Sequence, residues 1–248
     1  MDADWRKRFL LIMIVVLGLV TARTAYLFYE RSRPGAPLPT PPTVPLTDDD
    51  YVTPHRIVPY DLKSAVKELA GKTVWVRNGN SVPYYRYHPQ TRSVEFAPKA
   101  GLLPPLDKLQ VTDVIPQRAP VSLAPGQVAV VRKQVMAIFE ESGRPGLCAV
   151  SIGTNMGDDF TFNVNEIFYY EDPHDLYKHW PPDVWHAIDQ HQVQKGMNEL
   201  QVSFALGSMV GASPGDYGNR WAQYRNDGEL VTVTFEKNRV VEIVGPSQ

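Results

Sequence analysis

The stretch ELVTVTFE, residues 229–236, has the most regular hydrophobic pattern in this chain. Val231, Val233 and Phe235 alternate with two threonines. Because successive side chains of a strand point to opposite faces, this alternation is typical of a strand in a sheet with one buried face and one wet face. The stretch therefore predicts an antiparallel sheet near the C-terminal end.

The sequences NRWAQYR (219–225) and RVVEIV (239–244) are the neighbouring strand candidates. The turn residues NDG (226–228) and KN (237–238) separate them from residues 229–236, where hairpin turns are expected. We expect the three strands to pair in chain order as an antiparallel meander.

Two helices are predicted between residues 180 and 207. The first follows the start signal PPD (181–183) and covers the sequence VWHAIDQH. The second has Asn198 as its N-cap, with Gln201 three residues later as in a capping box, and it ends at Gly207. Two helices packed on one face of the meander would make residues 173–248 a two-layer α+β domain.

The sequences VQKGMNELQVSFALG (193–207), WAQY (221–224) and ELVTVTFEKNRVVEI (229–243) together resemble the SmpA/OmlA domain, which has the BamE-like fold. The resemblance implies a protein-binding platform without catalytic residues, and its best-known setting is outer-membrane assembly. This chain departs from that family in three respects. It lacks a lipid-modified cysteine, it carries an anchor of inner-membrane type, and it has a long middle region. These departures set this chain apart from the known assembly lipoproteins, and a shared fold does not by itself imply a shared function.

The middle region, residues 60–172, is predicted to be a β-rich domain. It begins with a short helix candidate, DLKSAVKELAG (61–71), and continues with short β-type sequences punctuated by Pro and Gly. These are TVWV (73–76), PYYRY (83–87), SVEF (93–96), KLQVTDVI (108–115), QVAVVRKQVMAIFEE (127–141), LCAVSI (147–152) and DFTFNVNEIFYY (159–170). We expect mainly antiparallel pairing, and a small barrel is one form that such strands take.

Residues 9–29 are predicted to be a transmembrane anchor. The sequence FLLIMIVVLGLVTA (9–22) is uncharged and apolar, and the apolar stretch continues to Tyr29 if Arg23 extends to the membrane surface. At about 1.5 Å per residue, this segment is roughly 31 Å long, the thickness of the hydrocarbon core of a bilayer. The expected partner of residues 9–29 is therefore a lipid bilayer.

The basic residues Arg6, Lys7 and Arg8 precede the anchor. The positive-inside preference places residues 1–8 in the cytoplasm and the body on the other side of the membrane, in the periplasm or outside the cell. Small residues before position 23 leave an alternative open, a secretory signal cleaved after Ala22. Both alternatives export the body.

Residues 30–59 are predicted to be a Pro-rich linker. Between Arg33 and Pro59 the chain has eight prolines and few large apolar residues. Such a composition favours a semi-extended spacer that holds the body away from the bilayer.

Charge and cysteine content exclude several classes of function. The formal net charge is -2, and residues 1–33 have six Lys or Arg against three acids, so the remainder sums to -5. That excess of acid argues against a nucleic-acid partner, because phosphate binding needs a basic face. Cys148 is the single cysteine, so the chain can form neither an intramolecular disulfide nor a four-cysteine zinc site.

Four of the six histidines lie between residues 174 and 191 and alternate with acidic residues. A metal site is one hypothesis for His174, His179, His186 and His191. Their spacing places His186 and His191 on different faces of a helix, and no HExxH motif is present. GxSxG, P-loop and GxGxxG motifs are also absent from the sequence. We therefore expect no catalytic residues, no cofactor and no functional metal.

Aromatic residues are the candidates for a binding surface, with core packing as the alternative. The candidates are Trp75, Tyr84, Tyr85, Tyr177, Trp180, Trp185, Trp221 and Tyr224. The sequence thus favours a membrane-anchored binding or assembly module of the cell envelope that acts on an envelope protein. The alternatives are an envelope enzyme that hydrolyses peptidoglycan or peptides, and a histidine-rich metal-binding protein.

Overall fold

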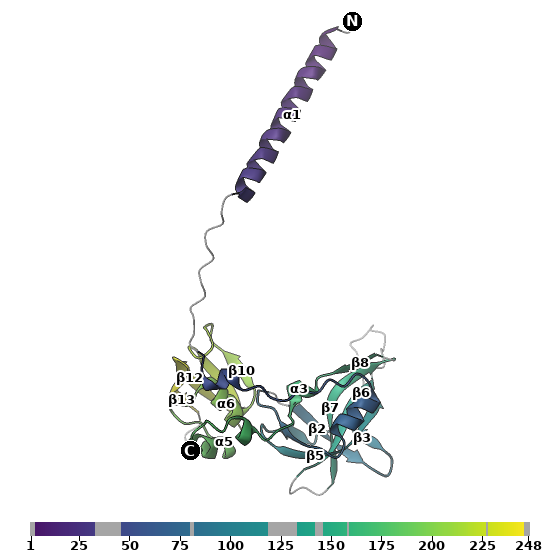
Figure 1. The fold of residues 1–248 in the computed structure, drawn as a ribbon, viewed down its shortest axis with the longest axis vertical. Helices are drawn as coiled ribbons and strands as arrows, with labels where there is room; N and C mark the ends of the chain where they lie inside the picture. Colours follow the sequence, from purple (N-terminus) through teal and green to yellow (C-terminus); the bar gives the residue numbers. More distant parts are fainter. Residues whose placement is uncertain are drawn as a thin grey trace. The chain divides into compact units, whose positions relative to one another are not determined.

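The computed structural model describes residues 3–32, 46–79, 82–118, 133–141, 146–157, 159–226 and 228–245. The chain divides into two compact units, Met1–Thr47 and Asp48–Gln248. It is a mixed α+β protein with an N-terminal apolar helix and a β-rich body built of open sheets (Figure 1). The central part of the linker, residues 33–45, and the start of the strand predicted at 127–141 lie outside the described residues, as do Asp158 and Asp227.

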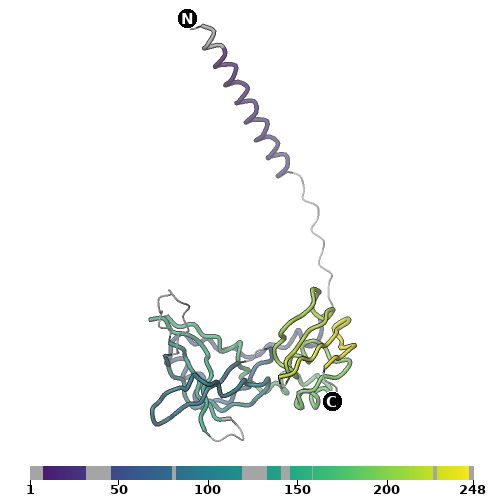
Figure 2. Tube along the Cα trace, turned by 180° about the vertical axis from the view of Figure 1, so that it is seen from behind, coloured from purple at the N-terminus to yellow at the C-terminus, as the bar shows by residue number. Residues whose placement is uncertain are grey.

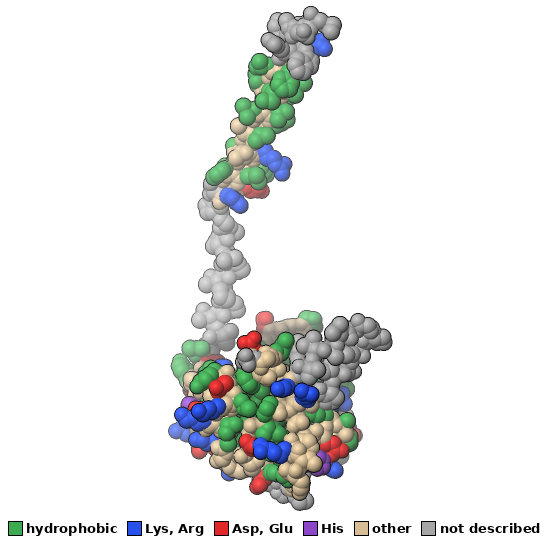
Figure 3. Space-filling view, turned by 90° about the vertical axis from the view of Figure 1, so that its right-hand side faces the viewer, with side chains coloured by type: hydrophobic (Ala, Val, Ile, Leu, Met, Phe, Trp, Pro, Cys, Tyr) green, Lys and Arg blue, Asp and Glu red, His purple; other side chains and the backbone are tan. Residues whose placement is uncertain are grey.

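The first unit contains helix α1, Ala3–Ser32. Within it, the 24 residues of Arg8–Arg31 are long and apolar enough to cross a membrane. Figure 3 shows its middle as a band of hydrophobic side chains, with charged side chains toward its ends. The structure thus agrees with a single-pass anchor at the predicted place.

The larger sheet of the second unit has nine strands. Its main order is β3-β2-β7-β6-β5-β1-β9, with β4 beside β2 and β8 beside β7, and all pairs are antiparallel. The strands are β1 (Thr73–Val76), β2 (Val82–His88), β3 (Ser93–Glu95), β4 (Gly101–Leu103), β5 (Lys108–Arg118), β6 (Lys133–Glu141), β7 (Leu147–Met156), β8 (Asp159–Phe162) and β9 (Phe168–Tyr169).

A closed barrel is not formed, because the described strands end at β3 on one side and at β9 on the other. The sheet nevertheless curls. Arg92, beside β3, has its Nη2 atom 3.6 Å from Asp113 Oδ2 on β5, although three strands separate β3 from β5. The buried side chains Val94 and Ile115 of these two strands belong to one hydrophobic cluster on the inner side of the curl.

Helix α2, Leu62–Leu69, covers the other face of this sheet. Asp61 caps it, accepting a hydrogen bond from the Ser64 backbone N–H, which lowers the pKa of the Asp61 carboxyl. Ala65 and Leu69 are fully buried against the sheet. The short helix at the predicted position is thus explained by its cap and its apolar face.

One predicted strand, residues 159–170, is interrupted. After β8 the chain forms helix α3, Val164–Ile167, and then β9. Val164 and Ile167 are both buried, and their spacing of three residues puts them on one side of a helical turn. Tertiary burial therefore overrides the strand propensity of this segment.

The C-terminal part has helices α4 (Pro173–Leu176), α5 (Pro182–Asp189) and α6 (Glu199–Leu206). Its sheet follows chain order as β10 (Met209–Ala212), β11 (Trp221–Asn226), β12 (Glu229–Glu236) and β13 (Arg239–Val244), as Figure 2 shows from behind in green to yellow. The three expected strands pair as a meander, and β10 is an additional strand that was not among the expected ones.

Residues 48–59, assigned to the linker by composition, belong to the compact second unit. They begin with a 3-10 helix, η1, Asp48–Tyr51, and continue without helix or strand. The Asn165 side chain pairs with both backbone groups of Ile57, donating to its carbonyl and accepting from its N–H. We call residues 48–59 the strap. Whether residues 60–172 and 173–248 are separate domains stays a prediction.

Candidate binding surface

The C-terminal sheet has one buried and one exposed face, set by the alternation in the sequence. Side chains of directly paired residues point to the same face. Ala222, Tyr224, Val233, Phe235 and Val240 point inward and are at most 3% exposed. They pack with side chains of α5 and α6 in one hydrophobic cluster.

The opposite side is called the outer face. Trp221 pairs with Thr234, and Gln223 pairs with Thr232, so these four side chains share it. Its other members, from the same register, are Gly211, Arg225, Leu230, Glu236, Arg239, Glu242 and Val244. The centre of the outer face is uncharged, and the charged side chains lie in its marginal strands or near a strand end.

Large apolar side chains of the outer face are open to solvent. Trp221 is 42% exposed, Leu230 47% and Val244 56%. Single exposed apolar side chains are common on protein surfaces, whereas three on one face of a sheet can contribute to an interaction site. The outer face is therefore the best candidate for recognition of a protein surface.

Buried polar contacts hold this sheet rigidly against α6. The Glu199 carboxylate, in the first turn of α6, accepts hydrogen bonds from the Arg220 guanidinium and from the Gly218 backbone N–H. Glu199 is 4% exposed, and the pairing raises the pKa of Arg220. Gly218 has φ +78°, and a side chain there would meet Asn238. This loop thus fixes the entry to β11, where Trp221 begins the strand.

The structure distributes the eight predicted aromatic residues over several environments. Trp221 is exposed, whereas Trp75 and Tyr85 are half-buried. The other five are buried in the hydrophobic cores, which is the core-packing alternative. They are Tyr84, Tyr177, Trp180, Trp185 and Tyr224. Trp180, Trp185 and Tyr177 surround Phe204 of α6 with ring centroids 5.0 to 6.2 Å away.

The four histidines of residues 174–191 have different partners. Both ring nitrogens of His174 face carboxylates, Nδ1 at 3.0 Å from Asp172 and Nε2 at 3.1 Å from Asp189. His186 Nε2 lies 3.1 Å from the Gln190 amide. His191 Nδ1 lies 3.1 Å from the carbonyl oxygen of residue 205. Among the described residues, no three His, Cys, Asp or Glu side chains gather as a metal site would require.

A shallow pocket of 460 Å³ lies beside α5. The His174 ring stacks on Trp185 with centroids 4.1 Å apart, and the pocket is lined by these two residues with Lys178, Trp180, Pro182, His186 and Asp189. The pocket is lined by aromatic rings and by both a basic and an acidic side chain. The stack on Trp185 and the contact with Asp189 hold α4 to α5, which is a structural role for His174.

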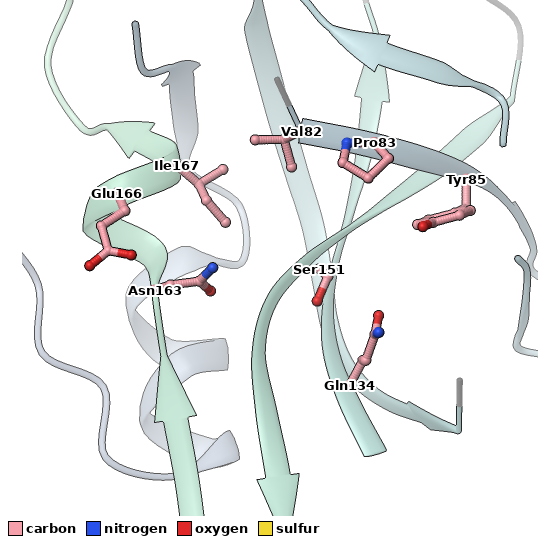
Figure 4. A pocket seen from close by; sticks show the side chains of 8 residues that line it. All are labelled: Val82, Pro83, Tyr85, Gln134, Ser151, Asn163, Glu166 and Ile167. Atoms are coloured by element: carbon pink, nitrogen blue, oxygen red, sulfur yellow. The ribbon is translucent and has the colours of Figure 1, made fainter. Parts of the chain in front are cut away.

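A second pocket, of 330 Å³, lies where β2 and β8 part from β7 (Figure 4). Figure 4 shows Pro83 and Tyr85 of β2 on one side and Asn163 and the residues of α3 on the other. Ser151 and Gln134 contribute polar groups from β7 and β6. The full lining is Val82, Pro83, Tyr85, Gln134, Ser151, Asn163, Glu166 and Ile167. Amides and a hydroxyl at this fork suit hydrogen bonding to a small polar molecule.

Sequence reasoning missed Asp49, whose carboxylate contacts three residues outside the strap. Its Oδ1 atom lies 2.7 Å from His179 Nε2 and 2.6 Å from Trp180 Nε1, and its Oδ2 atom lies 2.7 Å from Asn198 Nδ2. Asp49 stands in a run of three aspartates that resembles solvated linker, so composition gave no signal. The carboxylate joins the strap to the turn before α5 and to the N-cap of α6.

Comparison with known proteins finds no family model, no curated protein and no solved structure that matches this chain. The resemblance of residues 193–243 to the SmpA/OmlA domain therefore stays a prediction.

Proposed function

We propose that this chain is a membrane-tethered binding module whose body lies outside the cytoplasm and holds an envelope protein, without catalytic activity. The observation that carries the proposal is the exposed outer face of the C-terminal sheet, where Trp221 is exposed at the start of β11. Aromatic side chains on an uncharged, rigid surface are typical anchors of protein interfaces.

The BamE-like reading of residues 173–248 supports the same role. The second predicted helix has the reciprocal cap expected from the sequence, with Asn198 bonding the Gln201 N–H and Gln201 bonding the Asn198 N–H. The helices cover one face of the meander, which leaves the other face for a partner. Under this proposal the domain acts as a platform.

The anchor strengthens a weak interface by geometry. A body confined near a membrane meets other envelope proteins at a raised effective concentration, so an interface of modest affinity is sufficient. Orientation follows from the basic residues before the anchor. A reporter enzyme that functions only outside the cytoplasm, fused after Gln248, should be active in this fusion. Activity of a cytoplasm-specific reporter at the same position would overturn the orientation.

The test of binding uses the full-length protein in intact cells. Chemical crosslinking and mass spectrometry should recover one specific envelope protein, and Trp221→Ala should lower its yield about tenfold or more, as expected for an interface anchor. Tyr217→Ala is the matched control, because Tyr217 is 56% exposed but lies outside the sheet.

Two results would count against the proposal. The first is an equal yield from Trp221→Ala and the wild type. The second is recovery of no partner together with turnover of cell-wall fragments by the purified protein, which would favour a hydrolase. Stoichiometric zinc in the purified protein would favour the metal-binding alternative.

A further inference from the structure

Strand β13 is the end of the C-terminal sheet. It pairs with β12 on one side, and the described residues place no strand on its other side. An edge strand presents backbone N–H and C=O groups that another extended chain can pair with. The question is whether this edge is protected or open.

The first part of the edge is occupied by the chain itself. The Val240 N–H donates to the carbonyl of Met197 at 2.8 Å, and the Gly196 N–H donates to the carbonyl of Val240 at 2.9 Å. The chain then turns at Asn198 into α6 and leaves the edge. Residues 241–244 therefore continue an edge on which backbone pairing has already begun.

The open part of the edge has one of the usual protections against pairing, a β-bulge at Val241, where the register between β12 and β13 shifts, but it lacks lysine and proline. Natural edges are blocked by lysine, proline or several charges. Residues 241–244 are Val-Glu-Ile-Val, and the three apolar side chains are 37%, 36% and 56% exposed. Glu242 is exposed and is the single charged residue among the four.

We propose that residues 241–244 of β13 are the docking site for an extended segment of a partner protein, which adds to the sheet as a fifth strand. This inference rests on the proposed binding function and names the partner's form. The edge requires an extended chain because its backbone groups match only another strand. Ile243 points toward the core side with Val233, so an apolar partner residue fits beside it.

The charge of Glu242 selects the partner further. Glu242 points to the outer face, beside Thr234, and within the described residues no basic side chain pairs with it. A basic residue of the added strand fits next to this carboxylate. A second copy of β13 fits poorly, because a symmetric pairing centred on these residues brings two Glu242 carboxylates close together. The occupant is thus a partner segment that alternates apolar residues with a Lys or Arg.

The test introduces a photo-crosslinking amino acid into the full-length protein in intact cells. Positions Val241 and Val244 report on the edge, and Leu230 reports on the outer face away from it. We expect adducts from both edge positions to map to one short segment of one envelope protein. The two sites of attachment should lie about three residues apart, because paired strands advance together at roughly 3.3 Å per residue.

Charge reversal supplies an independent measurement. Glu242→Lys should lower the adduct yield from Val244 about tenfold, because it opposes the basic partner residue. Glu229→Lys, an exposed glutamate on β12, is the matched control and should leave the yield unchanged. The unfolding temperature of each variant shows whether the sheet itself is intact.

Each alternative result is distinct. Adducts from Leu230 alone mean that the partner lies on the outer face, so binding stands and edge docking fails. Adducts joining Val244 to the same strand of a second copy mean self-association and overturn the choice of partner. No adduct from any of the three positions, with catalytic turnover by the purified protein, overturns both this inference and the proposed function.

Discussion

Replacing Asp49 by asparagine is the sharpest test of how the strap is held. The substitution keeps the size of the side chain but removes its charge and turns one oxygen into an amino group. At present the two oxygens accept three hydrogen bonds, from His179, Trp180 and Asn198. An amide has one acceptor oxygen, so at least one of the three donors must face another donor.

The size of the effect follows from these contacts. Hydrogen bonds to a charged group contribute about 1.5–3 kcal/mol each, and neutral ones about 1 kcal/mol. The Asp49 side chain is 15% exposed and the His179 side chain 27%, so solvent screens them only in part. Losing one bond and weakening two should lower the free energy of unfolding by about 3 kcal/mol. For a body of this size that corresponds to a fall of about 6–12 °C in Tm.

Thermal unfolding followed by circular dichroism measures this fall on the full-length protein in detergent. Asp48→Asn is the matched control, because Asp48 is exposed and no hydrogen bond to its side chain is described. Hydrogen exchange should also become faster in the first turn of α6, where Asn198 is the cap. If Asp49→Asn and Asp48→Asn melt at the same temperature, the strap is not held by this carboxylate and the reasoning fails.

Three further predictions concern the core. Tyr170→Phe should leave the free energy of unfolding unchanged or raise it by up to about 1 kcal/mol, because the buried Tyr170 hydroxyl has no described partner. Tyr169→Phe should lower the free energy of unfolding by about 1–2 kcal/mol, because the Tyr169 hydroxyl donates a hydrogen bond to Asn78. Urea unfolding compares the two variants, and the reverse order of stability would contradict this account. Burial raises the pKa of both tyrosines, so their contribution to stability is complete below pH 10 and is lost as the pH rises toward their folded-state pKa. Absorbance at 295 nm should show that these two hydroxyls ionise together with alkaline unfolding. Ionisation of both hydroxyls at their ordinary pKa in the folded protein would refute this. Gly153→Ala should destabilise the protein by about 2 kcal/mol or more, because the new methyl group would meet a backbone carbonyl of β8 at 2.3 Å. Gly211→Ala is the control and should be tolerated, because its new methyl group would lie 3.6 Å from its nearest neighbour. Equal melting temperatures of the two variants would argue against the close approach of β7 and β8.

Strong local patterns in the sequence were sufficient to place several elements. Residues 9–29 are apolar except for Arg23 and two threonines, and they lie within α1. Asn198 and Gln201 form the predicted capping box, because the bonds of a capping box involve residues only three positions apart. The alternation of residues 229–236 likewise placed β12, whose inward side chains are the buried ones.

Other features depend on contacts that are distant in the chain and leave no local pattern. Strand β10 contains two small residues, Gly211 and Ala212, so its strand propensity is weak and pairing with β11 forms it. The position of Asp49 beside Trp180 joins residues 131 positions apart. The uncovered outer face was missed as a surface, because a pattern of alternation tells which side is wet but not whether another element covers it.

The strap has a mechanical consequence for a tethered protein. A pull transmitted along the chain from residues 1–47 reaches the Asp49 contacts before the bond from the His55 N–H to Glu171, and it reaches that bond before the pairing of Ile57 with Asn165. Bonds loaded one after another yield at a smaller force than bonds loaded together. We therefore expect the strap to detach stepwise from its N-terminal end under load, which would lengthen the chain between residues 1–47 and the sheets.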